Sequence, residues 1–193
     1  WDSISYNVRG GQSVKTIALA PSDQNYIYAA TYSTLKVTTD AGSTWTSIKP
    51  GLPNYNITDV TVSNTNPDHI WVTFSEYSAA HKVYESTDRG VSWTNITGTS
   101  LPNLPVNCIV YQGQTNGDLY IGTDVGVYYK DNSMSDWQPF MNGLPNVIIR
   151  ELEIHYEKGT ISAATYGRGV WESPLNTTPS EIKESETFSF SIY

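Results

Sequence analysis

The chain of 193 residues has little positive charge and no long apolar run. Its 11 Lys and Arg residues are outnumbered by 19 Asp and Glu residues, which gives a formal net charge of -8. Binding to nucleic acid requires clustered cations that contact phosphates, and this composition does not provide them. No apolar stretch approaches the roughly 20 residues of a membrane-spanning helix. We therefore expect no nucleic-acid partner and no membrane insertion.

Cysteine and histidine are too few for the sites that they usually build. Cys108 is the only cysteine and lies in the apolar run 106–110, so we expect a buried core residue and neither a disulfide nor a catalytic thiol. The three histidines have no paired spacing, which argues against zinc. Asp124 could join a calcium site, although a turn between two strands also explains it. We predict no metal and no cofactor.

Helical periodicity is also missing from every long stretch of the sequence. Tyr, Trp, Thr, Val and Ile are plentiful, while Gly and Pro recur at short intervals. This combination is typical of short β-strands joined by turns. The composition therefore favours an all-β fold.

Four units of similar sequence follow one another along the chain. Equivalent positions of the first strand in each unit are Ile17, Val60, Ile109 and Leu152, separated by 43, 49 and 43 residues. The first three units each predict four short strands, at 16–21, 26–31, 35–38 and 45–48, at 59–63, 69–74, 82–85 and 93–96, and at 107–111, 118–123, 126–129 and 137–140. The fourth predicts three strands, at 151–155, 160–165 and 169–173. A period in the forties with four strands per unit is typical of a β-propeller.

A short motif occurs twice, each time directly after a predicted third strand. Its Asp can accept hydrogen bonds from the backbone N–H groups that follow, its Gly can supply a positive φ, and its Ser or Thr hydroxyl can brace the turn. The Trp then begins the returning strand and buries its ring. The motif predicts a hairpin turn built by Thr38, Asp40, Gly42 and Trp45 in the first unit, and by Ser86, Asp88, Gly90 and Trp93 in the second.

These features resemble the Asp-box, or BNR repeat, of sialidases, sortilin-type receptors and the xyloglucanase family. In those proteins the box marks the turn between the last two strands of a propeller blade. The resemblance implies a β-propeller of four-stranded antiparallel blades, about four of which are represented here. In the third unit only Trp137 of the box is intact, since Asn132 falls at the Asp position and Met134 replaces the Gly. We expect that turn to have a different shape.

The two ends of the chain match parts of a blade. The segment Trp1-Asp2-Ser3-Ile4 matches Trp45-Thr46-Ser47-Ile48, so it is predicted to be an outer strand of a preceding or a closing blade. Either it completes the fourth unit and closes a ring of four blades, or the chain is the C-terminal part of a larger propeller. The second interpretation is favoured here. It places the propeller blades in residues 1–175.

Residues 176–193 differ in composition from the rest of the chain. They begin with a polar, acidic stretch that predicts a linker, followed by an alternating segment. The segment 165–173 resembles the closing motif of propellers in secreted Bacteroidota proteins, where a pair like Ile192-Tyr193 often opens the sorting domain of type IX secretion. The Pro-Asn-Pro that follows the pair in those proteins is absent here. The resemblance implies export, with the type IX secretion machinery as a partner and 176–193 as linker and start of a sorting-type domain.

Candidates for catalysis are few. A sialidase-type site needs a cluster of Arg residues, and only four Arg residues exist. Arg150 and Glu151 precede a predicted inner strand and could face the central funnel, although a solvated loop pair is the favoured interpretation. A xyloglucanase-type site needs two carboxylates across a cleft, one as acid and one as base. Asp59 is the best single candidate, but a turn-bracing role is favoured and no partner carboxylate can be assigned.

The sequence therefore predicts an exported module, secreted or on the cell surface, that binds a glycan or a protein ligand or acts as a scaffold. No catalysis is expected within these residues. One alternative is part of a secreted glycoside hydrolase, xyloglucanase-like or sialidase-like, with catalytic residues elsewhere. Another is a component of a cell-surface adhesin.

Overall fold

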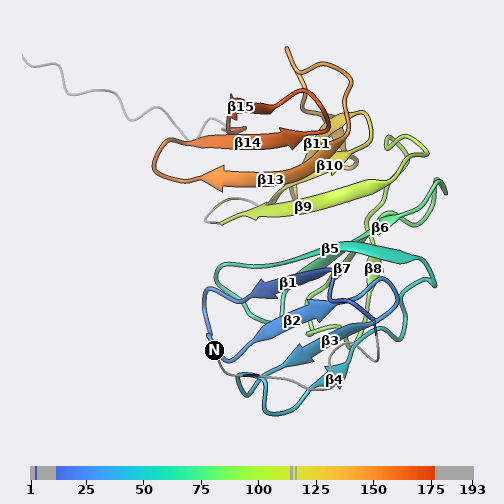
Figure 1. Ribbon diagram of the computed structural model, residues 1–193, viewed down its shortest axis with the longest axis vertical. Coiled ribbons are helices and arrows are strands. Elements are labelled where there is room, and N and C mark those ends of the chain that lie inside the picture. The colour runs from blue at the N-terminus through green and yellow to red at the C-terminus, as the bar shows by residue number, and fades with distance from the viewer. Residues whose placement is uncertain (1–2, 4–11, 114, 116, 177–193) are drawn as a thin grey trace, which may run out of the picture.

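The computed structural model describes residues 3, 12–113, 115 and 117–176. Within them the chain forms β-strands without any helix, arranged as four antiparallel sheets in sequence order (Figure 1). The predicted all-β class and the four repeated units are confirmed. The matched segment at residues 1–4 and the segment 177–193 fall almost entirely outside the described residues, so the expectations for them remain predictions.

Each sheet contains the strands of one repeated unit and forms one blade. Blade 1 contains β1 (Thr16–Leu19), β2 (Ile27–Ala30), β3 (Leu35–Thr38) and β4 (Thr46–Ser47). Blade 2 contains β5 (Asn56–Val62), β6 (Ile70–Ser75), β7 (Val83–Ser86) and β8 (Thr94–Asn95). Blade 3 contains β9 (Val106–Gln112), β10 (Asp118–Thr123), β11 (Gly126–Lys130) and β12 (Gln138–Pro139). Blade 4 contains β13 (Ile149–His155), β14 (Thr160–Thr165) and β15 (Val170–Pro174).

Within every blade, neighbouring strands pair antiparallel in the order of the sequence. The fourth strands are only two residues long, shorter than predicted. Blade 4 has three strands among the described residues, as the sequence predicts. Three of the inner strands, β5, β9 and β13, begin earlier than predicted. Arg150 and Glu151 therefore lie inside β13, which corrects their placement before an inner strand, and Asp59 lies inside β5.

The first strand of each blade lies on the inner side of the molecule. These inner strands contact one another in the order β1, β5, β9 and β13. Figure 1 shows β1 and β13 at opposite ends of this row, separated by β5 and β9. The four described blades therefore form an open arc.

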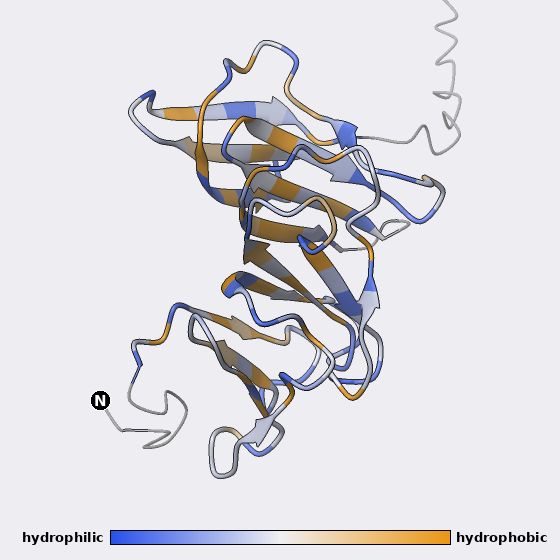
Figure 2. Cartoon of the chain, turned by 90° about the vertical axis from the view of Figure 1, so that its right-hand side faces the viewer, coloured by the Kyte–Doolittle hydropathy of each residue, from blue (hydrophilic) through white to orange (hydrophobic). Residues whose placement is uncertain are grey.

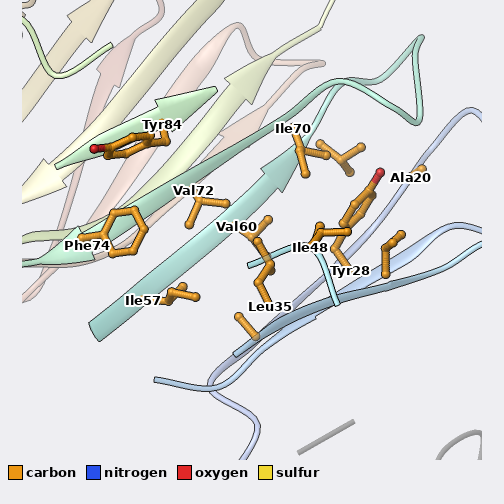
Figure 3. Packing of buried hydrophobic residues seen from close by; sticks show 13 residues of the cluster. Ala20, Tyr28, Leu35, Ile48, Ile57, Val60, Ile70, Val72, Phe74 and Tyr84 are labelled. Carbon is orange, nitrogen blue, oxygen red and sulfur yellow. The ribbon is translucent and has the colours of Figure 1, made fainter. Parts of the chain in front are cut away.

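The hydrophobic cores lie between successive blades. One core joins blades 1 and 2, a second joins blades 2 and 3, and a third joins blades 3 and 4. Figure 2 shows the hydrophobic residues along the strands, with the connecting loops mainly hydrophilic. In Figure 3, Leu35 and Ile48 of blade 1 face Ile57 and Val60 of blade 2. Because each blade buries its faces against its neighbours, contact between blades is what holds the arc together.

Candidate functional site

The turn that carries the first copy of the repeated Asp- and Gly-containing motif, which we call the box, is closed by side-chain hydrogen bonds. Thr38 Oγ1 donates to Asp40 Oδ1 over 2.7 Å and accepts the backbone N–H of Gly42 over 2.9 Å. The Asp40 carboxylate also accepts from the backbone N–H of Thr44 (2.8 Å) and from its hydroxyl (2.7 Å). Ala41 and Gly42 both have positive φ, 55° and 97°. Thr38, Asp40 and Gly42 therefore make the contacts that close a hairpin turn, whereas the ring of Trp45 is only half-buried.

The turn of blade 2 repeats this geometry. Ser86 Oγ donates to Asp88 Oδ1 over 2.8 Å and accepts the backbone N–H of Gly90 over 2.7 Å. Asp88 accepts the backbone N–H of Ser92 (2.8 Å) and its hydroxyl (2.6 Å). Arg89 and Gly90 take positive φ, 63° and 83°. Since the side chains of Ser86 and Asp88 bond within the turn, these two residues serve folding and leave little for a ligand.

These hydrogen bonds stabilise the ionised carboxylates. The hydroxyl of Thr38, followed by the hydroxyl and N–H of Thr44, lowers the pKa of Asp40 to about 2. The hydroxyl and N–H of Ser92, followed by the hydroxyl of Ser86, lower the pKa of Asp88 to about 2. Donation to the charged form is the cause in both turns.

The box tryptophans connect one blade to the next. Trp93 of blade 2 donates its Nε1–H to the carbonyl of Ile48 in blade 1 over 3.1 Å. Trp137 of blade 3 is fully buried and donates in the same way to the carbonyl of Ile96 in blade 2 over 2.8 Å. Trp45 bonds within its own turn, to the carbonyl of Gly42. In blades 2 and 3 the box therefore fixes the neighbouring blade as well as its own hairpin.

The degraded third turn has a different shape, as expected, but a different residue braces it. Asp131, one position before Asn132, accepts from the N–H and hydroxyl of Ser133 (2.7 and 2.6 Å) and from the N–H of Met134 (3.1 Å). No residue between 131 and 136 has a positive φ. The bracing carboxylate of this turn therefore comes from Asp131 and not from the position at which Asn132 replaces the Asp of the motif. The motif spacing did not predict this role of Asp131, because Asp131 lies one residue before the position of the motif Asp.

Asp59 connects three inner strands. Its carboxylate accepts from the hydroxyl of Thr16 on β1 (2.8 Å), from the N–H of Val60 on β5 (2.9 Å) and from the N–H of Ile109 on β9 (3.0 Å). Burial raises the pKa of Asp59, and the same three hydrogen bonds act to lower it. The side chain therefore braces strands of three blades, whereas the sequence predicted that it braces a turn.

Glu151 in β13 is the equivalent of Asp59 in β5. Asp59 directly precedes Val60 and Glu151 directly precedes Leu152, and Val60 and Leu152 are equivalent positions of their strands. A register shift interrupts the strand pairing at both positions, between Ile149 and Glu151 and between Ile57 and Asp59. Burial raises the pKa of Glu151, and the negative charge of Asp59 raises it further. The structure thus brings the two predicted carboxylates into one electrostatic environment on the inner side of the arc.

Three exposed tyrosines share one face of the molecule, which we call the loop face. Tyr32, Tyr77 and Tyr166 lie in the hairpins between the second and third strands of blades 1, 2 and 4, and are 51%, 66% and 66% exposed. The inner strands begin at this face, because strand direction alternates along each antiparallel blade. The Lys15 ammonium lies 5.9 Å from the ring centroid of Tyr32, and the Arg150 guanidinium lies 5.2 Å from that of Tyr166. Sequence reasoning found Arg150 but missed the tyrosines, whose shared face depends on the repeat.

Other candidate chemistries find little support among the described residues. Cys108 is buried, as predicted, and burial raises the pKa of its thiol well above the ordinary value, which keeps it protonated. Within the described ranges no group of three or more His, Cys, Asp or Glu side chains is arranged to hold a metal ion. That part of the chain also contains no helix able to cross a membrane. Asp124 accepts a hydrogen bond from the Asn107 amide over 2.9 Å.

Comparison with known proteins supports the fold. No protein-family model matches the sequence. A xyloglucanase of Hypocrea jecorina (strain QM6a) is 28% identical over 127 residues, which cover 63% of this chain and 15% of that enzyme. The GH74 xyloglucanase of Xanthomonas campestris superposes with a TM-score of 0.62 at 14% identity, over 82% of this chain and 29% of that one. The structure of YCF48 bound to D1 peptide superposes with a TM-score of 0.62 at 20% identity, over 86% and 53%.

The fold is that of a β-propeller. Its four described blades are similar to blades of the xyloglucanase and of YCF48. The chain spans only a small part of the xyloglucanases and about half of YCF48. At these identities the structural likeness establishes the fold alone.

Proposed function

We propose that the chain is an exported β-propeller module that binds an extended ligand on its loop face and does not catalyse a reaction with the residues present here. A β-linked glucan chain is the ligand that we propose first. The observation that carries this proposal is the bonding of Asp59. A general acid or base must reach a substrate proton, and the carboxylate of Asp59 already accepts three hydrogen bonds from neighbouring strands.

The loop face offers the features that a sugar chain requires. Exposed tyrosine rings provide flat apolar surfaces with a polar hydroxyl at one end, and sugar rings pack against such surfaces through their C–H groups. Tyr32, Tyr77 and Tyr166 come from three different blades, so a ligand that contacts all of them must be extended. Lys15 and Arg150 add donors beside two of these rings. The match to a xyloglucanase supports the choice of glucan as ligand.

Binding can be tested by calorimetric titration of the chain with xyloglucan oligosaccharides. Changing Tyr77 and Tyr166 together to Ala should weaken binding at least tenfold, because each substitution removes an exposed ring on the loop face. The matched control is Val91→Ala, which changes an exposed apolar residue in the Asp-box turn on the opposite face. Equal affinity of the double variant and the control would contradict the proposal.

A second candidate is a catalytic segment of a glycoside hydrolase. It is favoured by the electrostatic coupling of Asp59 and Glu151, because a carboxyl group with a raised pKa is suited to act as the general acid. This candidate predicts that the chain releases reducing ends from xyloglucan, and that Asp59→Asn and Glu151→Gln each abolish the release. The first candidate predicts no release by any of these proteins.

A protein ligand on the same face is a further possibility within the binding proposal, since a similar structure contains a bound peptide. Type IX secretion remains our proposal for the export route. It rests on the segment 165–173 and on the pair Ile192-Tyr193. Reading the gene beyond the codon of Tyr193 tests it: a Pro-Asn-Pro triplet directly after this residue is expected, and any other continuation of the reading frame counts against the type IX route.

A further inference from the structure

Two aspartates lie opposite each other in blade 3. The pairing of Leu119 with Lys130 puts Asp118 and Asp131 at the next pair of positions along β10 and β11. Both aspartates are only 1% exposed, so their carboxyl groups are largely removed from water. Opposite residues of an antiparallel pair have Cβ atoms about 5 Å apart, and like charges at such positions weaken the pair. The fold therefore holds two acidic groups together in its interior.

The two carboxyl groups differ in their hydrogen bonds. Asp131 accepts three hydrogen bonds within its own turn and a fourth, over 3.2 Å, from the hydroxyl of Tyr129. Donors of this kind stabilise its ionised form. Neither oxygen of Asp118 has a hydrogen-bond partner in the described structure. A buried acidic group without a donor requires compensation by a proton or by a cation.

No basic side chain in the described part of the chain compensates these charges. Within it no Lys, Arg or His forms an ion pair with Asp118 or Asp131. Lys130, which directly precedes Asp131, donates its ammonium group to the backbone carbonyls of Asp131 and Met134. The two carboxyl groups are therefore left without a cation from these residues.

Neutral oxygen atoms lie beside the two aspartates. Gln112 of β9 pairs directly with Asp118, so the three side chains form a row across β9, β10 and β11. Oε1 of Gln112 accepts the hydroxyl of Tyr120 over 3.1 Å. Tyr120 and Tyr129 lie two positions along their strands from the aspartates, and hence on the same face, in the core between blades 3 and 4. Carboxyl, amide and hydroxyl oxygens thus gather on one face of blade 3.

This pair of aspartates is specific to blade 3. By the strand register, the positions equivalent to Asp118 and Asp131 hold Tyr26 and Thr39 in blade 1, His69 and Thr87 in blade 2, and Thr160 and Pro174 in blade 4. None of these pairs contains two acidic residues, so the propeller repeat does not require them. Blade 3 is also the blade in which the box is degraded. The paired carboxyl groups therefore call for an explanation of their own.

We propose that Asp118 and Asp131 bind a calcium ion, with the amide oxygen of Gln112 as a neutral ligand. Calcium takes six to eight oxygen ligands from carboxylates, amide carbonyls and water, at about 2.3–2.6 Å. Asp118 has both oxygens available for it. A proton on Asp118 would compensate only one of the two negative charges, whereas a divalent cation compensates both. With two carboxylates, we expect a dissociation constant of about 10⁻⁴ to 10⁻³ M, as in extracellular calcium modules.

Calorimetric titration of the full 193-residue chain with calcium chloride, after metals are removed with EDTA, tests the proposal. We expect one site per chain and a dissociation constant at least tenfold higher in Asp118→Asn. Asp124→Asn is the matched control, because it removes the same charge just beyond the other end of β10, where Asp124 bonds to Asn107. It should bind calcium like the natural chain. No binding to the natural chain, or equal affinity in Asp118→Asn, would overturn the proposal.

Thermal denaturation provides a second measurement. In EDTA, Asp118→Asn should melt above the natural chain, since the substitution removes a buried acidic group without a partner, and this transition also shows that the variant is folded. In about 10 mM calcium chloride the natural chain should gain about 3 °C or more, and Asp118→Asn should gain nothing. Equal gains in both proteins would show that calcium binds elsewhere on the acidic surface and would contradict a site at Asp118.

Discussion

At the scale of single residues, the Asp of each intact box is a folding device. Asp88 accepts two hydrogen bonds from Ser92 and one from Ser86, all within its own turn. Asp88→Ala should lower the melting temperature by about 2–5 °C and leave ligand affinity unchanged. Thermal denaturation and calorimetric titration measure the two effects, with Val91→Ala as the neighbouring control. Lost binding at an unchanged melting temperature would contradict this role.

The depressed pKa values of Asp40 and Asp88 predict how acid acts on the protein. A carboxyl group whose pKa falls from an unfolded value of about 3.9 to about 2 on folding stabilises the fold fully above the unfolded value. That contribution is lost as the pH falls through about 2. Urea midpoints between pH 5 and pH 2 should therefore decline more steeply for the natural chain than for a variant with both residues changed to Asn. If the urea midpoints of the two proteins declined in parallel as the pH falls, that result would contradict the hydrogen bonds assigned to Asp40 and Asp88.

The pKa of Asp118 is raised, in the opposite direction to the pKa values of Asp40 and Asp88. Asp118 is 1% exposed, and neither carboxylate oxygen has a hydrogen-bond partner in the described structure. Burial raises its pKa, the nearby Tyr129 hydroxyl acts to lower it, and the charge of Asp131 raises it further. The ionised form is disfavoured in the fold, so Asp118 costs stability as the pH rises above the unfolded value. Asp118→Asn should raise the melting temperature at pH 7 by about 2–4 °C, a gain that disappears below pH 4. A lower melting temperature at pH 7 would refute this.

At the scale of elements, the box turns link blades through a glycine. Gly90 and Gly143 both have φ near +80°, so Ala strains the backbone at either position. A Cβ at Gly90 would lie 2.7 Å from Cβ of Ile48 in blade 1, whereas Gly143 has open space around it. Gly143→Ala should cost about 1 kcal/mol of unfolding free energy and Gly90→Ala about 2–4 kcal/mol. Urea denaturation measures both losses, and equal losses would contradict the inter-blade contact.

The elements show what the sequence could predict. The order of strands and the two intact turns followed from local patterns, because their hydrogen bonds join residues close in sequence. For the third turn only a different shape could be predicted, because its bracing carboxylate, Asp131, lies one position before the Asn132 that aligns with the Asp of the intact motif. The partners of Asp59 could not be predicted, because they come from three blades and depend on a register shift between Ile57 and Asp59.

At the scale of the whole molecule, each blade depends on its neighbours. Successive blades share hydrophobic cores, and both ends of the described arc expose residues whose equivalents are buried elsewhere. Side chains from several blades lie on the loop face, so binding of a ligand that contacts all of them requires an intact arc of blades. Binding on this face without hydrolysis is the central claim about function.

One incubation tests that claim most directly. The chain is mixed with xyloglucan, and bound polysaccharide and newly formed reducing ends are measured in the same sample, for the natural chain and for Asp59→Asn. The binding proposal predicts retained polysaccharide and no new reducing ends with either protein, under conditions where Asp59→Asn remains folded. Reducing ends that form with the natural chain and disappear with folded Asp59→Asn would contradict it and identify Asp59 as a catalytic residue.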